Sequence, residues 1–235
     1  MPSRRLFLAL ALFALPASGS EPAWLEPTAS AIAEFGARSS PPDLARQVLR
    51  RFPDYRAGVG ETLRDSATTP DVAAAADLEA RSLVGAIRAH RPFSEIVRRC
   101  GRLAGWLTAA NQPLRAADRD VLESVFRDDY LRFVESRRRR FALARYRRPS
   151  DTPSALAAAA RARGDRLYDL IGREYRRVGV AAVRGTDAFD DRSTAFGIAS
   201  VSFSHAVSDV AAALAGVWRE AGGAESRGPI VITRR

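Results

Sequence analysis

The chain has 235 residues, 46% of them hydrophobic, so it is long and apolar enough to bury a sizeable core. Its one cysteine, Cys100, excludes a disulfide within the chain. All 37 basic residues are arginine, and the formal net charge of +10 implies attraction to anionic surfaces without identifying a partner.

The first 20 residues have the pattern of a secretory signal peptide. Arg4 and Arg5 precede an unbroken apolar run over residues 6–15, and small residues follow Pro16. This run is too short to span a bilayer, and it lacks the polar face of an amphipathic helix. We therefore expect residues 1–20 to be removed on export to a secreted or periplasmic location, which leaves no transmembrane anchor in the mature chain.

The remaining sequence predicts helices throughout. Helical spacing and start signals favour helices over residues 28–35, 43–52, 71–90, from 92 to about 111, from 118 or 120 to about 134, from 153 to 175 or 178, and over 194–220. Residues 53–69 and 180–193 are predicted to be loops. Since no alternating pattern is long enough to build a sheet, we predict an all-α protein with a single multi-helix bundle over residues 21–222 and a C-terminal tail over 223–235.

The segment CGRLAGWLTAANQPLR, from Cys100 to Arg115, is the most informative part of the chain. Positions 105 and 109 lie on one face of the predicted helix, where a histidine and an aspartate would bind a metal together with a histidine at position 115. The chain has Gly105, Ala109 and Arg115 there instead. The segment therefore has the frame of a metal site without its ligands.

Three features together resemble the bacterial zinc-dependent phospholipase C family, whose helical fold is shared with secreted single-strand nucleases. They are this frame, the early stretch WLEPTASAIA that begins at Trp24, and the late stretch FDDRSTAFGIASVSFSHAVSDVAAALAGVW. The resemblance implies an exported all-α bundle in which three zinc ions line a cleft.

The resemblance also implies where the zinc ligands would stand. It equates lost ligand positions with Ala29, Gly105, Ala109 and Arg115. It leaves Trp24 and Asp65 as retained family positions, and one of Asp128, Asp129 or Glu135 near a family glutamate. Signal cleavage after residue 19 or 20 would leave residues ahead of Trp24. Trp24 would then have no free amino group with which to bind a metal.

The histidine count argues against a working zinc site. The chain has only His90 and His205, whereas each zinc ion needs three or four nitrogen, oxygen or sulfur donors. Without zinc no activated water is available to attack a phosphodiester. We therefore expect a non-catalytic protein with a binding or scaffolding role and no metal or other cofactor. The alternative is a phosphodiester or phospholipid hydrolase with a reorganised metal site.

Other reactive side chains have simpler interpretations. Ser204, His205 and Asp209 suggest a hydrolase triad, but adjacent helical residues do not face one another, and only His205 and Asp209 are four apart. His90 is expected at a solvated helix end. Cys100 begins an apolar helical stretch and is expected to be a buried thiol rather than a reactive one.

A second candidate site is an anion-binding surface in the densest group of charges. It comprises Arg137, Arg138, Arg139, Arg140, Arg147 and Arg148, with Phe141 and Tyr146 interleaved. Guanidinium groups beside aromatic rings bind phosphates and stack on bases or lipid headgroups. A solvated helix face is the simpler interpretation. The sequence thus leaves a further alternative open, a basic module that binds nucleic acid or an anionic membrane.

Overall fold

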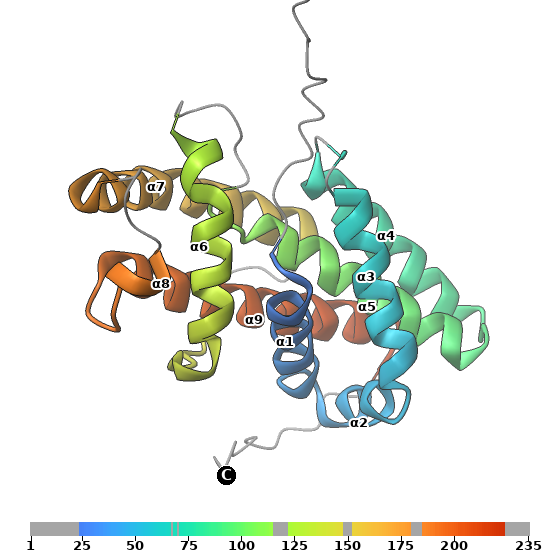
Figure 1. Ribbon diagram of the computed structural model, residues 1–235. Coiled ribbons are helices and arrows are strands. Elements are labelled where there is room, and N and C mark those ends of the chain that lie inside the picture. Colours follow the sequence, from blue (N-terminus) through green and yellow to red (C-terminus); the bar gives the residue numbers. More distant parts are fainter. Residues whose placement is uncertain are drawn as a thin grey trace, which may run out of the picture.

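The computed structural model describes residues 24–66, 68–69, 71–114, 122–147, 152–179 and 185–223. These residues form α-helices and one 3-10 helix, and no strand occurs among them (Figure 1). The prediction of an all-α multi-helix bundle is confirmed. The predicted signal peptide at 1–20 and residues 224–235 of the predicted tail lie outside the described residues.

The helix boundaries follow the start signals in the sequence. Asp71 caps α4 by accepting a hydrogen bond from the Ala74 N–H at 2.9 Å, and Pro153 stands in the first turn of α7. The elements are α1 Glu26–Arg38, α2 Pro42–Arg50, α3 Phe52–Ser66, α4 Val72–Arg88, α5 Phe93–Ala110, α6 Glu123–Arg137, the 3-10 helix η1 Arg138–Arg140, α7 Pro153–Val178, α8 Gly185–Ala188 and α9 Thr194–Glu220.

The last helix, α9, runs across the middle of the bundle and packs against α1, α4, α5, α6 and α7 (Figure 1). By length and composition alone α9 would be able to cross a membrane, but 72% of its most apolar window is buried inside the bundle. Its apolar surface is therefore covered by the other helices.

The predicted loop over residues 53–69 is wrong, because α3 occupies most of it. Gly58 and Gly60 lower the helix propensity of this stretch, which is why its sequence resembles a loop. Tertiary packing outweighs that propensity. The connection predicted over residues 180–193 is likewise interrupted by the single-turn helix α8.

The packing that stabilises α3 is a backbone contact with α5. A Cβ atom added to Gly58 would lie 2.0 Å from the carbonyl oxygen of Arg98, and one added to Gly101 would lie 2.0 Å from the carbonyl oxygen of Tyr55. Any side chain at either position would overlap the neighbouring backbone. Gly58, one of the glycines that weaken the local helical signal, therefore allows the two helices to touch, together with Gly101.

We expect Gly101→Ala to lower the free energy of unfolding by about 3 kcal/mol, because the backbones of α3 and α5 would have to separate. Gly85→Ala in α4 is the matched control: nothing lies within 4 Å of a Cβ there, and alanine's higher helix propensity should add about 0.5–1 kcal/mol. Urea denaturation measures both changes. A Gly101→Ala protein as stable as the wild type would contradict the backbone contact.

Candidate functional site

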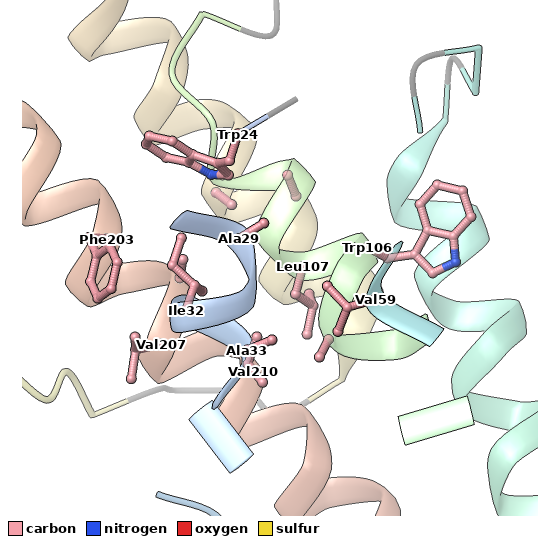
Figure 2. Packing of buried hydrophobic residues seen from close by; sticks show 14 of the residues in the cluster. Trp24, Ala29, Ile32, Ala33, Val59, Trp106, Leu107, Phe203, Val207 and Val210 are labelled. Carbon is pink, nitrogen blue, oxygen red and sulfur yellow. The ribbon is translucent and has the colours of Figure 1, made fainter. Parts of the chain in front are cut away.

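The positions equated with zinc ligands by resemblance lie in or beside tightly packed helices. Trp24 is buried, and its Nε1 donates a hydrogen bond to the Thr108 carbonyl oxygen at 3.0 Å. Ala29 on α1 is fully buried, and Figure 2 shows both residues beside α5. Trp24 therefore anchors the start of the described chain to α5 through its side chain.

The frame residues on α5 face neighbouring helices. A Cβ at Gly105 would lie 2.7 Å from the Cβ of Thr62, and Ala109 is fully buried. The Thr62 hydroxyl lies 3.1 Å from the Gly58 carbonyl oxygen and 3.0 Å from that of Arg102, so it bridges α3 and α5. A histidine side chain at position 105 has no room in this packing.

The remaining member of the frame, Arg115, lies outside the described residues. Among the residues that the structure does describe, no group of three His, Cys, Asp or Glu side chains is arranged to hold a metal ion.

Asp65, which the resemblance leaves as a family position, lies at the end of α3 and belongs to an ion cluster. Its carboxylate lies 3.6 Å from Arg102, which also contacts Glu79 at 2.9 Å and Glu61 at 3.1 Å. A hydrogen bond from Arg98 lowers the pKa of Glu61, against the desolvation that would raise it. Three carboxylates from α3 and α4 thus converge on the guanidinium of Arg102, and Arg98 and Arg99 on α5 pair with two of them as well.

An open depression of about 840 Å³ lies beside α3, with Trp24 in its wall. Its charged side chains are mostly paired: Arg56 contacts Glu26 at 3.2 Å, and the Arg98 Nε donates to Glu61 at 2.6 Å. Neither Ala29, Gly105 nor Ala109 lines it. Apart from Trp24, this depression is therefore lined by ion pairs rather than by Ala29, Gly105 and Ala109.

The resemblance places one of three acids of α6 near a family glutamate, and two of the three attach α6 to the rest of the bundle. Asp129 accepts a hydrogen bond from the Tyr175 hydroxyl at 2.7 Å, and burial followed by this bond raises the pKa of Tyr175. Glu135 accepts a hydrogen bond from Thr28. Asp128 is exposed. These contacts place the two buried or half-buried acids in structural roles.

The three residues of the suggested hydrolase triad face different neighbours. The Ser204 hydroxyl accepts a hydrogen bond from the Ala144 N–H at 3.3 Å. The His205 ring stacks on Tyr146, with ring centroids 3.9 Å apart. Asp209 is fully buried on α9. A serine nucleophile and its base are therefore not assembled here.

Asp209 belongs to a buried polar network that the sequence did not reveal. Its Oδ2 accepts hydrogen bonds from Arg163 at 2.6 Å and from Asn111 Nδ2 at 3.0 Å, so α7, α9 and the turn after α5 meet there. Arg163 also donates to Asn111 Oδ1 at 3.0 Å. The only local signal was the polar pair Asn111 and Gln112 after an apolar helix. Asn111 and Gln112 are 98 and 97 residues from Asp209 in the chain, so no local pattern joins them to it.

The arginine segment, which we define as residues 137–147, runs from the end of α6 through η1 into extended chain. Its extended part lies on α9, where Ser204 and Ser208 accept hydrogen bonds from the backbone N–H groups of Ala144 and Tyr146. Arg145 donates to the Ser39 carbonyl oxygen at 2.9 Å. Side chains from α9 and a carbonyl after α1 thus fix the path of an irregular stretch.

The candidate anion-binding arginines differ in what they contact. Arg138 pairs with Glu135 at 2.8 Å, and Arg140 pairs with Asp191. Arg139 and Arg147 are exposed and have no ion-pair or hydrogen-bond partner in the part of the chain that the structure describes. Arg137 is half-buried, and Arg148 lies outside the described residues. Arg139 and Arg147 are therefore the best placed to meet an anion.

The chain was compared with known protein families, with curated protein sequences and with solved structures, and none of the three comparisons found a match. The resemblance to zinc-dependent phospholipase C therefore rests on the sequence features quoted above.

Cys100 is buried in α5, as predicted, and burial raises its pKa to about 12. The thiol should therefore stay protonated and react only negligibly with a thiol reagent such as DTNB at pH 8, whereas unfolding in guanidinium should release one reactive thiol per chain. Because the folded-state pKa lies above the unfolded value, this group's contribution to stability should be lost as pH rises from about 8.5 toward 12. Rapid modification of the folded protein at pH 8 would contradict this burial.

Proposed function

We propose that this chain is an exported helical protein on a degenerate zinc phospholipase C-like scaffold, and that it binds an anionic membrane surface rather than hydrolysing phosphodiesters. The observation that carries the binding role is the arginine segment, whose backbone is fixed against α9 while Arg139 and Arg147 remain exposed. The packing around Gly105 supports the loss of hydrolysis.

The case against zinc hydrolysis is steric as well as chemical. A zinc ligand must place its donor atom about 2.0–2.2 Å from the metal. At position 105, even a Cβ atom would overlap Thr62, and Asp65 is already paired with Arg102. Recovering a ligand at 105 would require α3 to move away from α5, which the contacts at Gly58 and Gly101 oppose.

Elemental analysis of the purified protein, after incubation with zinc and dialysis, should find well below one zinc ion per chain. Assays with a chromogenic phosphodiester should show no turnover above that of a chelator-treated sample. Three zinc ions per chain together with chelator-sensitive turnover would contradict the proposal and favour a reorganised hydrolase.

The fixed path of the arginine segment favours binding because its backbone is ordered in advance. Ser204 and Ser208 stand one helical turn apart on α9, and each accepts a hydrogen bond from the extended chain. A segment that is already ordered loses less conformational entropy when it meets a ligand.

The rings in the arginine segment favour a membrane surface over single-stranded nucleic acid. Phe141 is 7% exposed and packs on Phe203, and one face of Tyr146 lies on His205. These rings are therefore largely occupied and poorly placed to stack on bases. The arginines can still bind phosphate groups, which lipid headgroups also present.

Exposed apolar side chains accompany the arginines. Leu143 is 39% exposed, and Val201 on α9, three residues before Ser204, is 38% exposed. The backbone on either side of Leu143 contacts the Ser204 hydroxyl, so this leucine lies near that part of α9. Exposed basic and apolar side chains in one segment are typical of proteins that bind at a membrane interface.

We expect the double variant Arg139→Ala/Arg147→Ala to bind vesicles containing phosphatidylglycerol about 30-fold more weakly, since each basic residue near an anionic surface contributes about 1 kcal/mol. The matched control is Arg166→Ala/Arg173→Ala, which removes two exposed arginines from α7 and changes the net charge equally. Co-sedimentation at low and high salt measures both.

Equal weakening by the two double variants would show that only net charge matters, and would contradict a site in the arginine segment. Binding to phosphatidylcholine vesicles that equals binding to the anionic ones would also contradict it. Tighter, salt-sensitive binding to single-stranded DNA would favour the nucleic-acid alternative.

A further inference from the structure

The open depression beside α3, about 840 Å³ in volume, is lined mainly by one face of that helix. Four of its lining residues follow one another at intervals of four along α3, namely Phe52, Arg56, Gly60 and Arg64. Residues four apart are neighbours on a helix surface, so these four form a row. The chemistry of the depression is therefore set mainly by this row.

Gly60 leaves a gap in the row. Apart from the backbone of its own helix, the only described atom within 4 Å of a Cβ added to Gly60 would be a guanidinium nitrogen of Arg64, at 3.8 Å. The Arg64 side chain thus extends back toward the start of α3, as helical side chains do. A group bound over Gly60 would meet this guanidinium directly.

The charge of Arg64 is not balanced by a carboxylate. Arg64 is exposed and has no ion-pair or hydrogen-bond partner in the part of the chain that the structure describes. Three arginines and two glutamates line the depression. One of these glutamates, Glu61, pairs both with Arg98 and with Arg102, so it has no charge to spare for Arg64. The depression therefore has an excess of positive charge.

The other arginine of the row, Arg56, is held only by a weak pair. It contacts Glu26 at 3.2 Å, and both side chains are more than half exposed, at 53% and 70%. Ion pairs that are this exposed contribute little to stability. Arg56 can therefore leave Glu26 for a more highly charged anion.

Apolar surface adjoins the two arginines. Phe52 is half-buried, Pro53 and Ala57 are exposed, and all three line the depression. They lie within about one helical turn of Arg56. A ligand with a small apolar body can therefore lie against this surface while its anionic group faces the arginines.

We propose that this depression binds a soluble phosphomonoester with a small apolar body, with the phosphate over Gly60 between Arg56 and Arg64. At pH 8 such a phosphate has close to two negative charges, and guanidinium groups bind its oxygens through paired hydrogen bonds. The phosphate is bound and not transferred. This site shares no residue with the arginine segment.

Isothermal titration calorimetry of the full-length protein with phenyl phosphate at pH 8 tests the proposal. We expect saturable binding at one site per chain. Phenyl sulfate has the same ring but one negative charge, so it should bind at least about fivefold more weakly. Inorganic phosphate lacks the ring and should also bind more weakly than phenyl phosphate.

Arg64→Ala should weaken phenyl phosphate binding at least about tenfold, because it removes the guanidinium that has no other partner. The matched control is Arg166→Ala, which removes an exposed arginine of α7 outside the depression and should leave binding unchanged. Glu26→Gln should strengthen binding about threefold, since it frees Arg56 and removes a competing carboxylate. A purely structural role for Glu26 would not give tighter binding.

Gly60→Leu blocks the space over Gly60 without changing any charge. The near neighbour of its Cβ is the flexible end of Arg64, and leucine favours a helix more than glycine does, so this variant should fold. It should lose phenyl phosphate binding but still bind phosphatidylglycerol vesicles like the wild type, which separates this site from the arginine segment.

The proposal is overturned if phenyl phosphate gives no saturable binding or if phenyl sulfate binds as tightly. It is also overturned if the folded Arg64→Ala or Gly60→Leu protein binds phenyl phosphate like the wild type. Binding to phosphatidic acid vesicles that depends on Arg64, without binding of phenyl phosphate, would assign the site to a lipid headgroup and would exclude a soluble ligand.

Discussion

The contact between α3 and α5 determines more of this structure than any other interaction. Gly58 and Gly101 bring the two backbones together, and Thr62 fills the space in front of Gly105. Because α3 has weak helix propensity, it depends on this contact to be helical at all. The same contact brings Arg102 close to Glu61, so that one guanidinium pairs with carboxylates from both α3 and α4.

This packing changes how the phospholipase C-like frame should be understood. If a small residue replaced a ligand and the helices stayed where they were, a void would remain, and voids lower stability. Here small residues at the frame positions coincide with closer helix packing. The frame thus has a structural use of its own, since Trp24 bonds to the Thr108 carbonyl and Asn111 to buried Asp209. We infer that the turn after α5 helps to organise the core.

Most charged side chains near the core serve internal contacts. Arg163 and Asp209 join α7 to α9, while Asp129 receives a hydrogen bond from α7. Removing one partner of such a buried pair destabilises a protein, because the other is left unpaired. These pairs therefore fix how the helices are arranged. The exposed Arg139 and Arg147 of the arginine segment, by contrast, remain available to a ligand.

The sequence by itself determined the elements that carry local signals. Asp71 marks the start of α4, Pro153 the start of α7, and the apolar run over 194–220 is the core helix α9, because caps, prolines and apolar spacing act within a few residues. Only the tertiary structure decided that residues 52–66 are helical and that Thr62 leaves no room for a larger side chain at position 105. Each of these depends on atoms far away in the chain. A glycine has the same local pattern whether it permits a loop or a backbone contact, and only the neighbouring helix distinguishes the two.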